Sequence, residues 1–151
     1  MEINIVFDLE FKGLLKSSWL KRVAQKTLKT QGICGNVELG LVITSREKIR
    51  QLNQRYRGES EPTDVLAFST EGPDVAPFIV PPDGVRHLGE VIISYPQAVI
   101  QAEEHQHSVE REIAILVIHG VLHLLGYEHD EPSLEHEMRA KEAEILGGLN
   151  I

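Results

Sequence analysis

Three histidines in the last third of the chain, His119, His123 and His129, have the spacing of a metal site. If the segment up to Leu125 is helical, residues four apart lie on one face, so His119 and His123 present their imidazoles side by side. Gly126 can adopt the left-handed conformation that ends a helix, which turns the chain so that His129 supplies a third nitrogen. Three imidazoles with a fourth position for water are typical of catalytic zinc, whereas structural zinc sites usually have four protein ligands.

This spacing matches the pattern H-E-x-x-H-x-x-G-x-x-H of one class of zinc peptidases at every position but one. Gly120 stands where that pattern has its general-base glutamate. A peptidase of this design would therefore lack its proton acceptor. The plainer alternative is that the histidines are core residues with ordinary hydrogen-bond partners, but a third histidine just beyond a helix-ending glycine favours the metal site.

The composition is that of an ordinary globular protein, with 42% hydrophobic and 25% charged residues. A length of 151 residues predicts a single domain spanning residues 1–151. No apolar stretch approaches the length of a membrane span, and the first residues lack the pattern of a signal peptide. Cys34 is the only cysteine, which excludes an intramolecular disulfide. We therefore expect a cytoplasmic protein with no membrane partner.

The charge is unevenly distributed along the chain. The formal net charge is −8, which by itself argues against binding to nucleic acid. Residues 1–60, however, hold 11 lysines and arginines against 6 acidic residues, whereas residues 61–151 hold 4 against 17. The first part could carry a basic surface and the second could supply carboxylates that support a metal, although the same charges could simply solvate helix faces.

Periodicity and capping signals predict strands and helices in alternation, followed by a mostly helical end. A capping box at Thr44 and Glu47 opens a helix that ends at Gly58, with Ile49, Leu52 and Tyr56 as its buried stripe. A loop at 71–87 is expected to be mobile because it is rich in proline. The other expected elements are strands at 3–7, 37–43, 63–69 and 88–94, and helices at 17–30, 95–107, 108–125 and 132–146.

The helix capped by Ser108 is expected to be the most buried, because its residues 113–118 are all apolar. It delivers His119 and His123 to the edge of the core. Gly120 costs this helix about 1 kcal/mol relative to alanine, which suggests a close backbone approach near the metal. Upstream, Asp64 follows a proline and could simply cap a turn.

Four motifs resemble those of the YbeY family of bacterial metal-dependent endoribonucleases, also called rRNA maturation factors. The motifs follow the family's order, and the resemblance as a whole runs from about residue 3 to residue 146. Glu90 and Glu128 stand where the family commonly has aspartate, and Ala67 and Ser69 replace an expected serine and proline. The four motifs are Asn53-x-x-Tyr56-Arg57, Pro62-Thr63-Asp64-Val65-Leu66-x-Phe68, Leu88-Gly89-Glu90-x-x-Ile93-Ser94 and His119-Gly120-x-Leu122-His123-Leu124-Leu125-Gly126-Tyr127-x-His129.

The resemblance implies an α+β fold with a small mixed four-stranded sheet, about five helices and a metal site at the end of a buried central helix. It implies one zinc ion per chain, bound by His119, His123 and His129, and a functional arginine at Arg57 beside the metal. The implied substrate is single-stranded RNA, with roles in maturation of the 3′ end of small-subunit rRNA, ribosome quality control and RNA turnover. The implied partners are the small ribosomal subunit and its assembly factors.

Our mechanistic hypothesis is that zinc lowers the pKa of a water molecule and polarises a phosphodiester oxygen while Arg57 steadies the developing charge. His119 thus counts as both a ligand and a catalytic residue. No residue is clearly the general base, because His105, His107 and Glu112 could each be a capping or surface residue. The main alternative is a ribosome assembly factor with a mainly structural metal and little nuclease activity. The sequence leaves the oligomeric state open.

Overall fold

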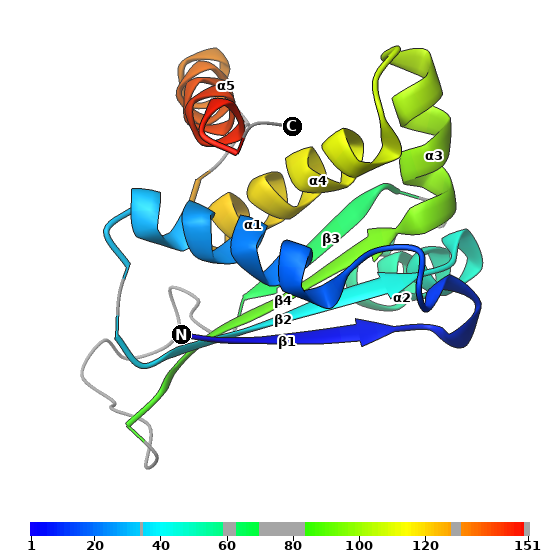
Figure 1. Ribbon diagram of the computed structural model, residues 1–151, viewed down its shortest axis with the longest axis horizontal. Helices are drawn as coiled ribbons and strands as arrows, with labels where there is room; N and C mark the ends of the chain where they lie inside the picture. Colours follow the sequence, from blue (N-terminus) through cyan, green and yellow to red (C-terminus); the bar gives the residue numbers. More distant parts are fainter. Residues whose placement is uncertain (34, 59–62, 70–83, 128–130, 150–151) are drawn as a thin grey trace.

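A four-stranded sheet carries the helices on which the expected site residues lie (Figure 1). The computed structural model describes residues 1–33, 35–58, 63–69, 84–127 and 131–149. Within them the fold is α+β, with a mixed sheet and five α-helices, as expected. The elements are β1 (Glu2–Phe7), the short 3-10 helix η1 (Leu9–Phe11), α1 (Ser17–Thr30), β2 (Val37–Thr44), α2 (Arg46–Arg57), β3 (Val65–Ser69), β4 (Arg86–Ser94), α3 (Tyr95–Glu104), α4 (Val109–Leu124) and α5 (Pro132–Gly147).

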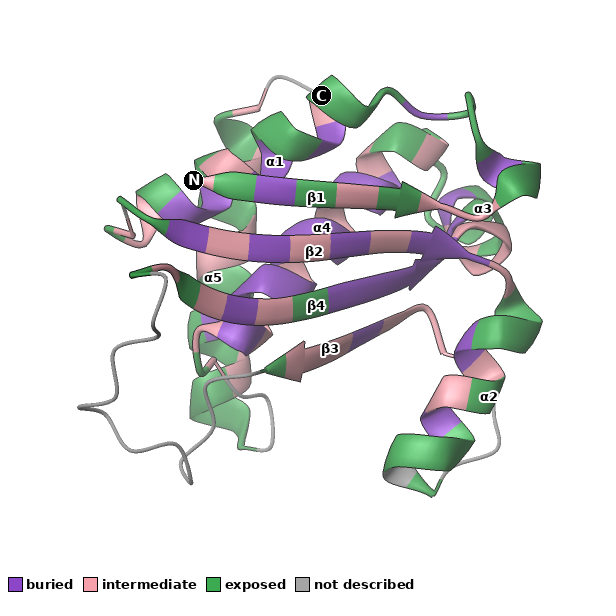
Figure 2. Ribbon diagram, turned by 90° about the horizontal axis from the view of Figure 1, so that it is seen from below, coloured by how far each residue is buried: buried purple, intermediate pink, exposed green. Residues whose placement is uncertain are grey.

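The strands lie in the order β1-β2-β4-β3. The two pairs β1·β2 and β2·β4 are parallel, whereas β3 is antiparallel to β4. Parallel neighbours need a crossover connection, and α1 supplies it between β1 and β2. Figure 2 shows the sheet from below, with buried residues concentrated on the two central strands.

Alternation along the central strands divides the sheet into two faces, because successive side chains point to opposite sides. Leu39, Leu41 and Ile43 of β2 join the main core beneath α1 and α4. On the opposite face, Ile49 of α2 packs with Leu66 and Ile92 in a smaller cluster. α1 and α4 therefore share one face of the sheet, and α2 packs on the other.

α4 is the central helix of the main core, as its apolar sequence predicted. It contacts α1, α3, α5, β3 and β4. Its buried apolar residues are Ile113, Ala114, Leu116, Val117, Ile118, Val121, Leu122 and Leu124. Each fully buried valine, leucine or isoleucine side chain contributes about 1.5–3 kcal/mol relative to exposure, so packing holds α4 rigidly as a support for the histidines on its last turns.

Gly120 is needed where α4 crosses β4. A methyl group added at Gly120 would lie 2.4 Å from Cγ1 and 3.0 Å from Cγ2 of Val91. Val91 is fully buried. The close backbone approach expected at Gly120 is therefore the approach of α4 to the sheet. Gly120 follows His119 in sequence, so the same crossing places His119 beside the sheet.

Several boundaries differ from those expected. The N-cap of α2 is Ser45, whose side chain accepts a hydrogen bond from the Lys48 amide, rather than Thr44. Thr44 is still in β2, and its hydroxyl donates to Asp8. Tyr56 was expected in the buried stripe but is 59% exposed.

α3 ends at Glu104 rather than near residue 107, because Gln106 adopts a left-handed backbone with φ of 57°. The strands expected at 63–69 and 88–94 span Val65–Ser69 and Arg86–Ser94. Most of the loop expected at 71–87 falls outside the described residues. Across the parts of the chain that the structure describes, no helix combines the length and apolarity needed to cross a membrane.

Candidate metal centre and active site

His119 and His123 lie on the last turns of α4 with their rings in an edge-to-face arrangement. Their centroids are 4.6 Å apart and their planes are inclined by 72°. The two Nε2 atoms are 3.1 Å apart. Two nitrogens bound tetrahedrally to one metal with bonds of about 2.1 Å lie about 3.4 Å apart, so the observed pair needs only a small expansion to share an ion.

Glu142 of α5 fixes the orientation of His119. Its Oε1 atom lies 2.6 Å from His119 Nδ1, and both side chains are only partly exposed. With Glu142 ionised, Nδ1 donates its hydrogen to the carboxylate, which leaves the lone pair on Nε2 for a metal. The sequence offered no signal for this pair, because Glu142 is 23 residues away on an acidic helix that reads as an ordinary solvated surface.

A cavity of about 320 Å³ opens beside the two histidines. Thr63, Asp64, Val65 and Ala67 line one side of it, and His119, Gly120 and His123 line the other. The cavity therefore lies between the start of β3 and the end of α4. These segments are more than 50 residues apart in sequence, and the contact of α4 with β3 brings them together.

Asp64 lines this cavity, and hydrogen bonds hold its carboxylate in place. Its Oδ2 atom accepts a hydrogen bond of 3.1 Å from Gln101 Nε2, and its Oδ1 atom accepts one of 3.3 Å from the Thr63 hydroxyl. Its carbonyl accepts a bond of 2.9 Å from the Ser94 amide. Asp64 thus places a carboxylate among the cavity-lining groups, where it favours a cation.

After α4 the chain turns at Gly126, the helix-ending glycine that the sequence predicted. Gly126 has φ of +100°, a backbone that side chains rarely adopt. The Tyr127 hydroxyl then donates a hydrogen bond of 2.7 Å to Gln31 Oε1 at the end of α1. His129 lies two residues further on, outside the described residues, so its role as a third ligand stays a prediction.

Arg57 is the last residue of α2. Gly58 follows as the expected C-cap, with φ of 72° and an amide that donates to the Gln54 carbonyl. The side chain of Arg57 falls outside the described part of the structure. Its placement beside the metal therefore stays a prediction.

His105, His107 and Glu112 come together where α3 meets α4, and they could hold a metal ion. Ser108 caps α4, and His105 is the C-cap of α3, so the capping role considered for these residues holds for His105. Burial raises the pKa of Glu112, but its hydrogen bonds with His105 and His107 outweigh burial and set that pKa below its ordinary value. Sequence reasoning had considered these residues only as capping, surface or proton-accepting groups.

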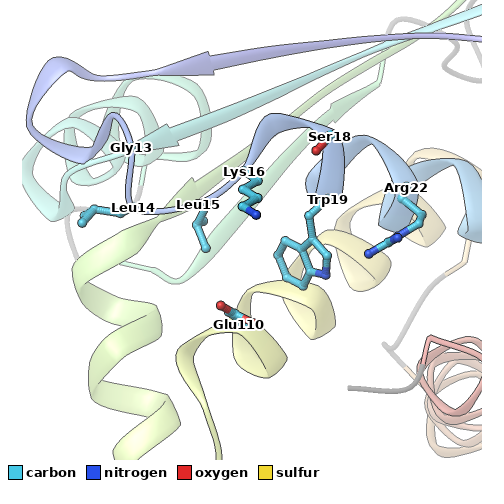
Figure 3. Close-up of a pocket in the computed structure, with 8 residues that line it drawn as sticks. All are labelled: Gly13, Leu14, Leu15, Lys16, Ser18, Trp19, Arg22 and Glu110. Carbon is cyan, nitrogen blue, oxygen red and sulfur yellow. The ribbon is translucent and has the colours of Figure 1, made fainter.

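A second hollow, of about 550 Å³, lies between α1 and α4 (Figure 3). Lys16, Trp19 and Arg22 are on its α1 side, and Glu110 is on its α4 side. It is larger than the cavity beside His119, but its described lining contains no histidine. Two cations beside an aromatic ring instead suit contacts with the phosphates and bases of a nucleic acid.

The fold and the first cavity define a class of protein: an α+β protein whose paired histidines, one oriented by a carboxylate, could hold a catalytic metal. A family model described as “Endoribonuclease YbeY” matches residues 8–150. The chain therefore belongs to the Endoribonuclease YbeY family, and the resemblance seen in its motifs is confirmed.

Individual relatives agree with this family. An Endoribonuclease YbeY from Dehalococcoides mccartyi is 53% identical over 146 residues, which cover 93% of this chain and 85% of the relative. Another from Roseiflexus castenholzii is 44% identical over 143 residues, with coverages of 94% and 89%. The solution structure of TM1509 from Thermotoga maritima matches with a TM-score of 0.63 and 30% identity, covering 97% of this chain and 88% of that one.

Proposed function

We propose that this chain is a zinc-dependent endoribonuclease that cleaves single-stranded RNA. The observation that carries the proposal is the pair of His119 and His123 Nε2 atoms, 3.1 Å apart at a cavity, in a member of an endoribonuclease family. His129 is proposed as the third ligand. Family membership favours RNA over peptide as substrate, which agrees with glycine instead of a general-base glutamate at position 120.

The chain's own residues have separable roles in this chemistry. His119 and His123, with His129 as the proposed third ligand, would hold a divalent metal, which would supply Lewis-acid chemistry toward water and a phosphoryl oxygen. Glu142 keeps the His119 lone pair available by accepting the Nδ1 hydrogen. Arg57 is proposed to pair with the phosphoryl oxygens as negative charge develops on them.

The proposed biological role is maturation of the 3′ end of small-subunit rRNA, together with ribosome quality control and RNA turnover. Partners would be the small ribosomal subunit and its assembly factors, and the work would take place in the cytoplasm, where ribosomes mature. One domain spanning residues 1–151 would carry the whole activity. The competing proposal is that the protein is a ribosome assembly factor with a mainly structural metal and little nuclease activity.

The decisive experiment compares the wild type with a His123→Ala variant. Metal content and cleavage of single-stranded rRNA are measured on both purified proteins, and circular dichroism checks that each is folded. We expect the variant to lose zinc and at least about 100-fold of its cleavage rate, since the proposed chemistry would depend on a metal that His123 helps to hold. A His136→Ala variant is the matched control, because His136 is exposed on α5.

Two outcomes would contradict the proposal. If the wild type carries zinc but does not cut RNA, the assembly-factor function takes its place. If His123→Ala cuts RNA at the wild-type rate, the histidine pair is not the active site.

A further inference from the structure

A second group of side chains that could bind a metal lies near the start of α4. Its member on α4 is Glu112, seven residues and therefore about 10 Å of helix rise before His119. His105 is the C-cap of α3, His107 is in the connection, and Glu112 is near the start of α4. His105 Nδ1 lies 3.1 Å and His107 Nε2 lies 2.6 Å from the same atom, Glu112 Oε2. All three ligand atoms lie within 4.8 Å of one another.

The turn between the helices is built in a way that brings both histidines to one side. Gln106 has φ of 57°, the only positive φ at a non-glycine residue in the described part of the chain. Its amide donates to the Glu103 carbonyl at 3.2 Å, and the His107 amide donates to the Ala102 carbonyl at 3.1 Å. A left-handed non-glycine residue costs about 1 kcal/mol or more, so the surrounding contacts must hold the turn in place.

Glu112 is a buried acidic residue, and each of its carboxylate oxygens has hydrogen-bond partners. Its side chain is only 2% exposed, and a carboxylate at such a site needs partners. Gln101 Nε2 donates to Oε1 at 3.1 Å. Oε2 is left to face the two imidazoles, and the His105 side chain, 54% exposed, borders the solvent. Two nitrogens and one carboxylate oxygen thus converge on a point reachable from outside.

We propose that His105, His107 and Glu112 bind a divalent transition-metal ion at a site separate from the His119 and His123 pair. Imidazole donors favour zinc, cobalt or iron over magnesium and calcium, which prefer oxygen ligands alone. Three protein ligands leave a position for water. Donors around a tetrahedral ion lie about 3.4 Å apart, so the 3.1 Å contact of His105 and the 2.6 Å contact of His107 with Glu112 must each open by less than 1 Å.

Gln101 links this site to the cavity beside His119. A side-chain amide has two hydrogens, and Gln101 Nε2 donates to both Glu112 Oε1 and Asp64 Oδ2, each at 3.1 Å. Gln101 therefore orients both the carboxylate of Glu112, a proposed ligand, and the carboxylate of Asp64 in the cavity. Such supporting partners typically contribute 10–100-fold to metal affinity.

The test uses Co²⁺ as a probe that reports its ligands by visible absorption. The full chain is stripped with a chelator and titrated with Co²⁺, and bound metal is counted by equilibrium dialysis. We expect two Co²⁺ per wild-type chain. His105→Gln should weaken the second binding step at least about tenfold, and His107→Gln should abolish it, while His123→Ala should remove the other step. His136→Gln, an exposed histidine on α5, should bind as the wild type does.

The proposal is overturned if His105→Gln and His107→Gln bind as much Co²⁺, with the same affinity and spectrum, as the wild type. The histidines would then be simple ion-pair partners of Glu112. Because the His105 side chain is more than half exposed, His105→Gln is expected to fold. If His107→Gln does not fold, the Co²⁺ binding of His105→Gln alone tests the proposal. Failure of the proposed nuclease function would leave this count unchanged, since the two sites share no ligand.

Discussion

At the scale of single residues, the distinguishing feature of the histidine pair is the carboxylate behind it. Glu142 holds His119 from a different helix, at 2.6 Å from Nδ1. A ligand whose tautomer and ring orientation are fixed loses little freedom when it binds a metal. The affinity of the site should therefore depend on a residue that does not touch the ion.

We predict that Glu142→Gln lowers zinc affinity 10–100-fold without unfolding the protein. Glutamine can still accept a hydrogen bond, but it removes the negative charge that strengthens the imidazole as a ligand. Competition with a chromophoric chelator measures the change. Glu144→Gln, on an exposed position of the same helix, is the control, and equal affinities for the two variants would remove Glu142 from the site.

Arg57 should affect cleavage without affecting the metal. Arg57→Ala should reduce the cleavage rate by about 10²–10³-fold, the usual effect of removing one group that stabilises transition-state charge. Zinc content should stay at the wild-type value. Arg55→Ala, two residues earlier at the end of the same helix, is the matched control. Unchanged cleavage in Arg57→Ala would limit this arginine to a surface role.

At the scale of elements, the crossing of α4 over β4 positions the whole site. The crossing depends on the missing side chain at Gly120, because Val91 fills the space where a methyl group would lie. Alanine would gain about 1 kcal/mol of helix propensity, but overpacking of a rigid core costs about 1–3 kcal/mol. Val91 is β-branched and fully buried, so it has little room to move and overpacking should win.

We therefore predict that Gly120→Ala lowers the free energy of unfolding by up to about 2 kcal/mol, the cost of overpacking less the gain in helix propensity. Chemical denaturation measures this, and a double-mutant cycle with Val91→Ala should show that the two changes are less costly together than their sum. Gly147→Ala is the control, since nothing lies within 4 Å of a methyl group at that glycine. A Gly120→Ala protein as stable as the wild type would mean that α4 can shift away from the sheet.

At the scale of the whole molecule, the net charge of −8 hides a basic excess in residues 1–60. Lys16 and Arg22 belong to that part and flank Trp19 at the hollow between α1 and α4. α5, in contrast, has a small acidic excess, with four glutamates against one arginine and one lysine. RNA approaching the molecule should therefore be attracted to the α1 side.

Replacing Lys16 and Arg22 together by glutamine should weaken binding of single-stranded RNA and make it less dependent on salt. Each lost phosphate contact reduces the slope of log affinity against log salt by about 0.7 for a single strand, so we expect a change of about 1.4. Fluorescence anisotropy at several salt concentrations measures it. Changing Arg139 and Lys141 of α5 in the same way should leave the slope unaltered; equal effects would exclude a specific RNA face.

Much of the local structure follows from the sequence alone. Apolar periodicity located the strands and helices to within a few residues, and the caps at Ser108 and Gly58 were predictable because they satisfy neighbouring backbone groups. The i,i+4 spacing placed His119 and His123 on one face of α4. These features depend on residues within a turn or two of one another, so local rules are sufficient.

Only the tertiary structure decided which distant residues meet at the sites. Glu142 reaches His119 because α5 packs on α4, and Asp64 reaches the cavity because β3 lies beside the same helix. His105, His107 and Glu112 meet because the strained turn at Gln106 aims both rings at one carboxylate. Such pairings have no local periodicity, since they depend on how whole elements pack, and packing is determined by the complete core.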